Sequence, residues 1–377
     1  MKTYQGSNTT QLYLQSLADL LKEGQEVSPR GKRIKELRPV IFQFDPKNRV
    51  TFLKGRKINP FFQMAESIWI LNGRPDVKWL TNYNKNMSQF SDDGIYFNAP
   101  YGERLRFWNK NTYRNFVFNP TDQLLGAFYR LKEDKDTRQA VASIYNPLFD
   151  GFSYDGKDVP CNLLLTFKIR NDKLDLTVFN RSNDIHWGTF GANLCQFSTI
   201  QETMASWLGI DTGSYYQITD SLHVYLDDYG AKETGKILTA YNLSTDNPNI
   251  PEVNHFQFEN EPRIELVLED FENMMEGFND NIDPHLNNES TNLKSVLNVL
   301  LNCPDEYFKN VFLSMFIYTA HKRKNTNMVI EGFQGMSDSQ WKLSCLHFLR
   351  KQYADLNAYQ DLYEHYSDDK KEYIEEG

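Results

Sequence analysis

The fold of this chain is decided by the stretch from Lys157 to Asn193, which reads KDVPCNLLLTFKIRNDKLDLTVFNRSNDIHWGTFGAN. Apolar side chains alternate with polar ones on either side of Asn171 and Asp172, a pattern that predicts two strands joined by a tight turn. Two features depart from this pattern. A lone cysteine, Cys161, follows a proline near the start, and a polar Arg-Ser-Asn-Asp cluster interrupts the end. Both departures mark candidate functional positions.

Helices and strands alternate outward from this stretch. Upstream, the apolar spacing predicts a helix over residues 10–23, short strands at VIFQF and VTFLKG, and a helix over PFFQMAESIWILNG. Downstream, it predicts a helix over residues 192–208 and then strands within YYQITDSLHVY. This succession predicts an α/β core.

The composition changes after this core. The segment STDNPNIPEVNHFQFENEP is rich in Asn and Pro, as connectors are, and mostly helical patterns follow it. We therefore expect a catalytic domain over residues 1–262 and a mostly helical C-terminal extension over residues 263–377. One predicted helix of the extension carries an apolar stripe formed by Phe308, Val311, Phe312, Met315 and Phe316.

Composition and charge exclude several classes of protein. The 377 residues are 40% hydrophobic and 14% aromatic, with no apolar run of the roughly 18 residues that a membrane span needs. A net charge of −9 argues against direct binding of a nucleic-acid backbone. The start lacks an apolar signal core, and the cysteines at 161, 195, 303 and 345 have neither disulfide nor metal-site spacing. These features favour a cytoplasmic protein without a metal centre.

Several dispersed residues are candidates for chemistry. Cys161 fits either a small buried core residue or a nucleophile, and Arg138 and Arg181 are placed to lower the pKa of its thiol or to bind a phosphate. Glu66 lies in the apolar segment AESIWILNG, where a buried carboxylate needs partners or a function. His223 and Tyr225 are two residues apart, so on a strand they face the same side.

Together these segments resemble the thymidylate synthase family, which includes pyrimidine nucleotide hydroxymethylases. SPRGK is similar to the family's early phosphate-binding loop, AESIWILNG to its catalytic glutamate helix, and NAPYGERL to its Tyr-Gly segment. VPCN is similar to the nucleophile site, RSND…G…N to the phosphate and base site, and LHVY to the sugar site. The resemblance covers residues 10–240 and implies a curved mixed β-sheet flanked by helices.

The resemblance implies a covalent mechanism. Cys161 would add to carbon 6 of a pyrimidine nucleoside monophosphate and so activate carbon 5 toward the one-carbon unit of 5,10-methylenetetrahydrofolate. Glu66 and Tyr101 would assist the proton transfers through water, and Asp184 is counted with them as catalytic. The substrate-binding residues would be Arg30, Arg138, Arg181, Ser182, Asn193, His223 and Tyr225. Among these, Arg138 would come from the second subunit of a homodimer with shared active sites.

The sequence departs from the family pattern at several points. Gln139 stands where a second arginine usually follows Arg138, and the spacing from Arg181 to Asn193 is one residue longer than in typical synthases. Asn193 favours uracil, because an aspartate at this position is the usual mark of family members that act on deoxycytidylate. The family's apolar closing residues are absent from EYIEEG.

The resemblance leaves open which reaction follows the covalent steps, hydroxymethylation or methylation. Synthases carry two tryptophans in the loop before the Tyr-Gly segment, whereas NKNMSQFSDDGIYFNAPYG has none, and Met87 and Phe90 stand nearest those positions. A more hydrated site favours hydroxymethylation of dUMP over the synthesis of dTMP. Two more interpretations stay open at this point, a dCMP hydroxymethylase and a catalytically inactive nucleotide-binding relative.

Overall fold

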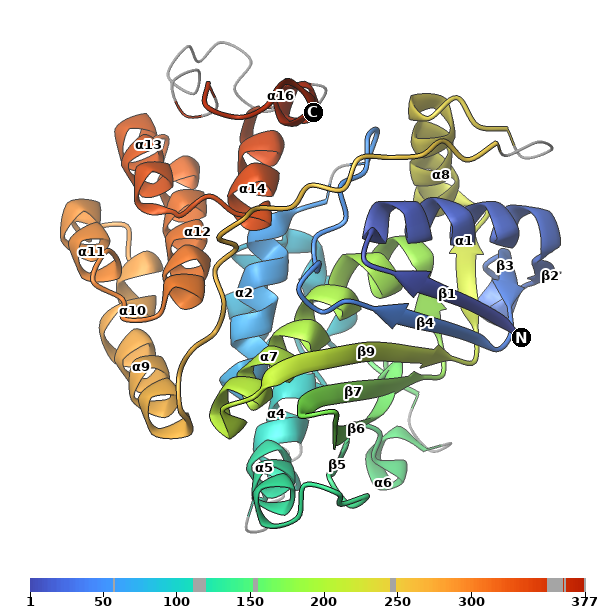
Figure 1. The fold of residues 1–377 in the computed structure, drawn as a ribbon, viewed down its shortest axis with the longest axis horizontal. Helices are drawn as coiled ribbons and strands as arrows, with labels where there is room; N and C mark the ends of the chain where they lie inside the picture. The colour runs from blue at the N-terminus through green and yellow to red at the C-terminus, as the bar shows by residue number, and fades with distance from the viewer. Residues whose placement is uncertain are drawn as a thin grey trace. The chain divides into compact units, whose positions relative to one another are not determined.

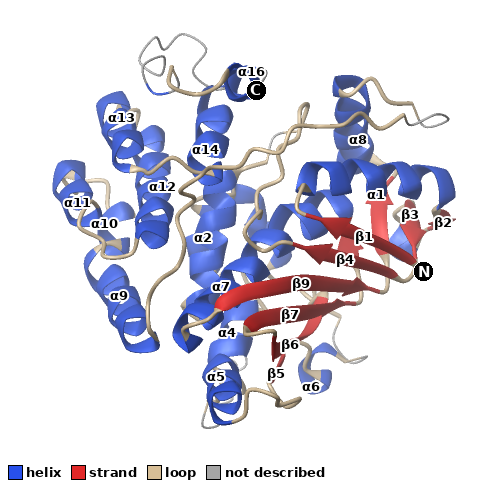
Figure 2. Ribbon diagram, in the orientation of Figure 1, coloured by secondary structure: helices blue, strands red, loops and turns tan. Residues whose placement is uncertain are grey.

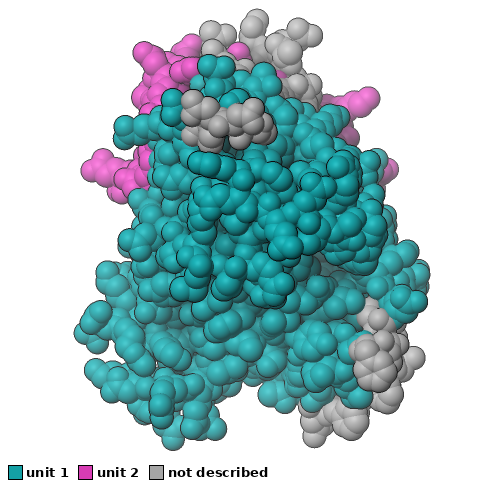
Figure 3. All heavy atoms as spheres, turned by 90° about the vertical axis from the view of Figure 1, so that its right-hand side faces the viewer, with its two compact units in different colours: residues 1–56, 66–253 teal, residues 57–65, 254–377 magenta. Residues whose placement is uncertain are grey.

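The computed structural model describes residues 1–56, 58–110, 120–151, 155–244, 249–350, 362 and 364–375. The chain folds into two compact units, coloured separately in Figure 3. The first, called the catalytic unit below, comprises residues 1–56 and 66–253. The second, called the helical unit, comprises residues 57–65 and 254–377. None of the described helices is long and apolar enough to cross a membrane.

The catalytic unit is built on a six-stranded mixed sheet (Figure 1). In spatial order its strands are β1 (Lys2–Gly6), β4 (Val40–Phe44), β9 (Asp211–Thr219), β7 (Lys173–Asn180), β6 (Asn162–Arg170) and β5 (Val141–Ser143). The predicted hairpin is confirmed, since β6 and β7 pair in antiparallel fashion and both Asn171 and Asp172 adopt positive φ in the turn between them. The predicted α/β core is therefore confirmed.

A second, four-stranded sheet carries several of the predicted site residues, among them Asp184, His223 and Tyr225. It runs in the order β2 (Gln25–Val27), β3 (Ile34–Leu37), β10 (Leu222–Tyr225) and β8 (Asn183–Asp184). The register of β10 against β8 places His223 opposite Asp184. The sequence pattern did not predict this sheet, because β8 has only two residues.

Helices cover the sheets. They are α1 (Thr9–Glu23), α2 (Pro60–Leu71), α3 (Val77–Thr81), α4 (Tyr101–Arg106), α5 (Gln123–Glu133), α6 (Pro147–Asp150), α7 (Leu194–Leu208) and α8 (Asp228–Ala240). Helix α7 packs against β7 and β9 and is buried along almost its whole length. Its N-terminus follows directly from a π-helix over Ile185–Asn193. The π-helix therefore connects β8 of the small sheet to the helix that packs on the six-stranded sheet.

The strand predicted at VTFLKG, residues 50–55, is wrong. Its backbone is buried, but its polar groups bond to side chains of α1 rather than to a neighbouring strand. The Thr9 hydroxyl donates to the Val50 carbonyl at 2.9 Å, and the Thr10 hydroxyl both donates to and accepts from the backbone of Phe52 at 3.0 Å. Side-chain hydrogen bonds thus replace a strand ladder here.

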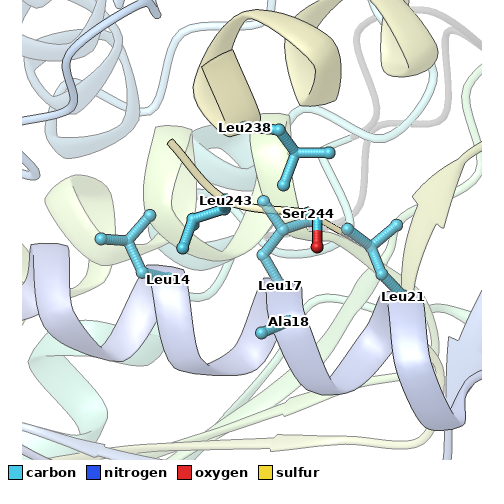
Figure 4. Close-up of a pocket in the computed structure, with 7 residues that line it drawn as sticks. All are labelled: Leu14, Leu17, Ala18, Leu21, Leu238, Leu243 and Ser244. Atoms are coloured by element: carbon cyan, nitrogen blue, oxygen red, sulfur yellow. The ribbon is translucent and has the colours of Figure 1, made fainter. Parts of the chain in front are cut away.

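Helices α1 and α8 also line a small apolar pocket (Figure 4). Its walls are Leu14, Leu17, Ala18, Leu21, Leu238, Leu243 and Ser244. Apart from one hydroxyl, these side chains offer no group for chemistry, and none is a candidate site residue. The pocket is a packing feature of the two helices.

All regular elements in the described part of the helical unit are helices (Figure 2). They are α9 (Leu268–Asn281), α10 (Asp283–Leu286), α11 (Leu293–Leu300), α12 (Glu306–Lys322), α13 (Thr326–Gly335), α14 (Gln340–Arg350) and α16 (Asp368–Glu375). The predicted apolar stripe lies on α12 and is entirely buried. Phe312 of this stripe stacks on Phe278 of α9, with ring centroids 4.2 Å apart. The sequence boundary at residue 262 stays a prediction, and the helical unit begins at Asn254 and also takes residues 57–65.

Candidate active site

Cys161 lies in the loop that enters β6. The thiol residue is half-buried, unlike the fully buried Cys195 and Cys345, so the core-residue interpretation does not describe it well. The Cys161 N–H donates to the Tyr101 hydroxyl at 3.3 Å, and its carbonyl accepts from the Arg181 N–H at 3.0 Å. The backbone of the nucleophile candidate is thus fixed on both sides.

Arg181 holds this loop with its side chain as well. Its Nε donates to the Pro160 carbonyl at 2.9 Å and its Nη2 to the Val159 carbonyl at 3.0 Å. A guanidinium with several fixed donors suits this task, because two parallel bonds determine the orientation of the loop. Arg181 therefore positions Cys161 in addition to supplying positive charge.

Burial and the neighbouring charges act on the pKa of the Cys161 thiol in opposite directions. Burial raises the pKa of Cys161, Arg181 and Arg30 lower it, and Asp158 raises it. Arg181 thus lowers the pKa of the thiol as predicted, but burial outweighs it and the net pKa lies above the ordinary value. Desolvation disfavours the thiolate more than the two cations favour it.

Asp158 is a functional candidate that the sequence interpretation missed. Its Oδ2 accepts from the Ala99 N–H at 2.7 Å, and its carbonyl accepts from the Asn98 side chain at 3.2 Å. Together with the bond to Tyr101, these contacts join segments 98–101 and 158–161. Burial raises the pKa of Asp158 to about 6. A carboxylate three residues before a candidate nucleophile was the available signal.

Tyr101 begins α4 and stacks on Phe197 of α7, with ring centroids 6.4 Å apart. Burial raises the pKa of its phenol, and the charges of Cys161 and Asp158 raise it further. The hydroxyl is therefore neutral over the physiological range and can both accept and donate a hydrogen bond.

Glu66 is buried on α2, with 8% of its surface exposed. Burial raises the pKa of its carboxyl to about 8, against a hydrogen bond from Gln196 that lowers it. Its Oε2 has no hydrogen-bond partner among the described residues. A carboxyl in this state is mostly protonated at neutral pH and has one oxygen available to a substrate.

A chain of buried amides connects the nucleophile loop to Asn193. The Asn162 side chain donates to Asn193 Oδ1 at 3.2 Å, the Asn193 amide donates to Asn183 Oδ1 at 3.1 Å, and Asn183 donates to Gln217 at 2.8 Å. Asn180 also donates to Asn162. Each carboxamide has two N–H donors and two lone pairs, so Asn193 retains one of each for a ligand.

Most of the spacing between Arg181 and Asn193 is occupied by the π-helix over Ile185–Asn193, whose i→i+5 bonds take more residues per turn than those of an α-helix. Asn193 at its end remains part of the amide network. Gly188 lies in this π-helix, and a Cβ there would lie 2.3 Å from Asn183 Oδ1. Only glycine therefore allows this close approach.

Asp184 caps the same π-helix. Its Oδ1 accepts from the N–H groups of His186 and Trp187 at 2.7 and 3.3 Å, and its Oδ2 accepts from the Tyr229 hydroxyl at 2.9 Å. Both carboxylate oxygens are thus oriented by the protein. Tyr229, on α8, is a second residue that the sequence interpretation did not single out.

The predicted sugar-binding residues His223 and Tyr225 lie on β10 of the small sheet. The rings of His223 and Tyr225 meet edge to face at 5.3 Å, which confirms that they share a face of β10. The pKa of Tyr225 is raised by burial and by the charges of Asp184 and Cys161, and is lowered by Arg30. Charges from three other segments of the chain therefore act on the Tyr225 phenol. Ser182, which follows Arg181 and precedes β8, is half-buried.

Arg138 is the candidate that the structure does not bring to this cluster. It is exposed three residues before β5 and forms no hydrogen bond or ion pair within the described part of the chain. Gln139, its neighbour, is exposed as well.

Comparison with known proteins identifies the family. Residues 11–273 match the family model described as thymidylate synthase. The chain belongs to the thymidylate synthase family. This family transfers a one-carbon unit from 5,10-methylenetetrahydrofolate to a pyrimidine nucleotide. The predicted family and fold are therefore confirmed.

Several members of the thymidylate synthase family are similar to this chain. It is 52% identical to the deoxyuridylate hydroxymethyltransferase of Bacillus phage SP01 over 369 residues, which cover 95% of this chain and 96% of that protein. It is 37% identical to the deoxyuridylate hydroxymethyltransferase of Pseudomonas phage M6 over 60% of this chain and 62% of that protein. A putative thymidylate synthase of Methanosarcina mazei is 34% identical over 49% of this chain and 82% of its own length.

Proposed function

We propose that this protein is a deoxyuridylate hydroxymethyltransferase. In this reaction dUMP, methylenetetrahydrofolate and water give 5-hydroxymethyl-dUMP and tetrahydrofolate. The observation that carries the proposal is the similarity to the SP01 phage protein of that name, because it extends over nearly the whole of both chains and so includes the helical unit. The geometry around Cys161 supports the same chemistry.

Cys161 is the proposed nucleophile, attacking carbon 6 of the uracil ring. Arg181 holds the Val159 and Pro160 carbonyls and thereby fixes the direction from which the sulfur approaches. The pKa of the Cys161 thiol is raised in the free protein, so the thiol is protonated before substrate binds. The thiolate would therefore form when the substrate binds and the thiol loses its proton. The charges of Arg30 and Arg181 favour that step.

Glu66 is the proposed acid. Its protonated carboxyl would deliver a proton through ordered water toward the exocyclic oxygen of the ring, where negative charge develops when sulfur adds. A raised pKa suits this task, because an ionised carboxylate would repel that charge. Tyr101, whose hydroxyl is fixed by the Cys161 N–H, would organise the water that removes the carbon 5 proton.

Asn193 is proposed to read the base. Its remaining lone pair can accept from the ring N–H of uracil, and its remaining N–H can donate to the adjacent carbonyl. The neighbouring amides, Asn162 and Asn183, hold the side chain in one orientation. Uracil offers the donor and acceptor that this orientation matches, which supports dUMP as substrate.

The folate side of the site is proposed to lie at the π-helix. Trp187 is 41% exposed next to Asp184, so an apolar ring surface and a carboxylate with fixed orientation lie together, and these groups fit an aromatic heterocycle with N–H donors. When bound, the folate supplies the one-carbon unit. Tyr229 would keep the Asp184 carboxylate oriented toward it.

The choice of hydroxymethylation over methylation rests on water access. Residues 84–101 contain no tryptophan, and of the two side chains nearest the family's tryptophan positions, Met87 is buried whereas Phe90 is 40% exposed. This loop therefore supplies no indole to exclude water from the one-carbon unit on carbon 5. The competing reaction is thymidylate synthesis, in which tetrahydrofolate would deliver hydride and leave as dihydrofolate.

One assay separates these reactions. Purified protein is incubated with dUMP and methylenetetrahydrofolate, the nucleotide is analysed by mass spectrometry, and dihydrofolate is followed by its near-ultraviolet absorbance. We expect 5-hydroxymethyl-dUMP without stoichiometric dihydrofolate. A methylated nucleotide with one dihydrofolate per turnover would establish a synthase, and preference for dCMP in competition would overturn the role of Asn193. A folded preparation that binds dUMP but gives no product would be an inactive nucleotide-binding protein.

We further propose that the enzyme works in the cytoplasm as a homodimer with shared active sites. The support is that Arg138 is exposed and without a partner among the described residues, although the family resemblance assigns it to phosphate binding. A phosphate bound in the neighbouring subunit would give this arginine a counter-charge.

A further inference from the structure

Helix α2 belongs to both compact units. Its first half, through Ala65, is part of the helical unit, and its second half, from Glu66, is part of the catalytic unit. The proposed acid is thus the first catalytic-unit residue of a helix that begins in the helical unit. Whatever holds the first turn of α2 also bears on Glu66, because a helix is stiff over its 12 residues.

Two aromatic residues of the helical unit hold that first turn. Tyr318, on α12, stacks on Phe61 with ring centroids 5.2 Å apart and an interplanar angle of 27°. Phe348, on α14, meets the same Phe61 ring edge to face at 5.8 Å. Phe61 is fully buried, so this contact contributes hydrophobic as well as aromatic stabilisation.

Tyr318 also reaches the helix cap. The Asn59 side-chain oxygen accepts from the Phe62 N–H at 3.1 Å, as an N-cap does immediately before Pro60. The pKa of Tyr318 is raised by burial and lowered by a hydrogen bond from the Asn59 side chain. One tyrosine therefore contacts both the capping residue and the first buried ring of α2.

Glu66 depends on the exact seating of this helix. It follows Phe61 by five residues, or about 7.5 Å along the axis. Its neighbours on α7 are Gln196, which bonds to it, and the Cys195 thiol, whose pKa it raises. The charged groups nearby are Arg49, which lowers the pKa of Cys195, and Glu202, which pairs with Arg49. With Oε2 unpartnered, a small shift of α2 would admit water and expose the carboxyl.

We propose that Tyr318, acting through Asn59 and Phe61 along the continuous helix α2, is a positioning residue for Glu66. The inference rests on the proposed function, in which Glu66 acts as the acid.

The test uses the full-length chain and two readouts. Tyr318→Ala removes both contacts, whereas Tyr318→Phe keeps the ring and removes only the hydrogen bond. For Tyr318→Ala we expect kcat to fall about tenfold or more with KM for dUMP within about twofold, because the acid is displaced while the nucleotide site is retained. Since activity requires protonated Glu66, the alkaline limb of the pH–rate profile should move to lower pH. Tyr318→Phe should show a smaller effect in the same direction.

The second readout is independent of turnover. In protein labelled with carbon-13 at glutamate carboxyls, the Glu66 signal is identified by its loss in Glu66→Gln, and its titration midpoint should fall in Tyr318→Ala because water reaches the carboxyl. The matched control is Phe278→Leu, which disrupts the stack of Phe278 on Phe312 between α9 and α12 of the same unit. This control should lower thermal stability but leave both readouts unchanged.

The outcomes are distinguishable. If the wild type makes 5-hydroxymethyl-dUMP and Tyr318→Ala matches Phe278→Leu in kcat and in the titration midpoint of Glu66, the positioning role is refuted while the proposed function stands. If the wild type makes no such product, the proposed function fails, and the carbon-13 titration still decides whether Tyr318 controls the environment of Glu66.

Discussion

Replacing Glu66 by glutamine tests the electrostatics of the proposed acid. Burial raises the pKa of this carboxyl from an ordinary 4.5 to about 8. The folded protein therefore binds the proton more tightly than the unfolded chain does, and stability from this group is lost as pH rises through the interval. At roughly 1.4 kcal/mol per pH unit, the free energy of unfolding falls by about 5 kcal/mol between low pH and pH 8 because of this one group. At pH 7 the loss is about 3 kcal/mol.

Glutamine has nearly the same shape but does not ionise, so Glu66→Gln should remove this dependence. The measurement is the free energy of unfolding in urea for both proteins between pH 5 and pH 9. Contributions of all other titrating groups are common to the two proteins and cancel in the difference. We expect the variant to gain stability relative to the wild type by roughly 1.4 kcal/mol per pH unit up to about pH 7.5, and then to level off.

Activity should change in the opposite sense. The variant should lose about 10²- to 10⁴-fold in kcat, because the amide cannot supply the proton. Retention of nucleotide binding, measured by calorimetry, is the control for folding. A stability difference that is flat between pH 5 and pH 9 would show that Glu66 is not held protonated, and the reasoning about the acid would be refuted.

Two further predictions concern the nucleophile and the dimer. Cys161→Ser should keep the fold and nucleotide binding but lose turnover by several orders of magnitude, since an alkoxide is far less available than a thiolate; near-normal turnover in a quenched-flow or steady-state assay would contradict covalent catalysis by this residue. Mixing inactive Cys161→Ser and Arg138→Ala chains should restore part of the activity, because one heterodimer site then has both native side chains. If mass spectrometry verifies that the subunits have exchanged and activity still does not recover, the result would argue against a shared site.

Local sequence patterns were sufficient to single out the proposed nucleophile and the proposed acid. Cys161 stood out because proline and cysteine interrupt a strand pattern, and Glu66 because a carboxylate is unexpected within an apolar helix. Their roles came from the order of motifs along the chain. The pairing of His223 with Tyr225 followed from the two-residue period of a strand and is confirmed by the ring contact.

Other features depend on tertiary contacts that have no local signature. Asp158 acquires its role only because its carboxylate meets the Ala99 N–H, 59 residues away in the sequence. The thiol pKa could not be predicted from neighbouring arginines alone, because burial of Cys161 opposes them. The strand expected at residues 50–55 failed for a similar reason, since hydroxyls of α1 satisfy that backbone.

Cys161 and Glu66 share one property that bears on how the site works. Burial raises the pKa of each, so both side chains are mainly uncharged before substrate binds. An uncharged site costs less desolvation than a thiolate and a carboxylate held apart from water. In the proposed mechanism, negative charge would move from the thiolate to the ring oxygen as sulfur attacks carbon 6, and a protonated carboxyl could neutralise it there. Ionisation of Glu66 would therefore disable the site even with an intact nucleophile, which is why the seating of α2 matters as much as the environment of Cys161.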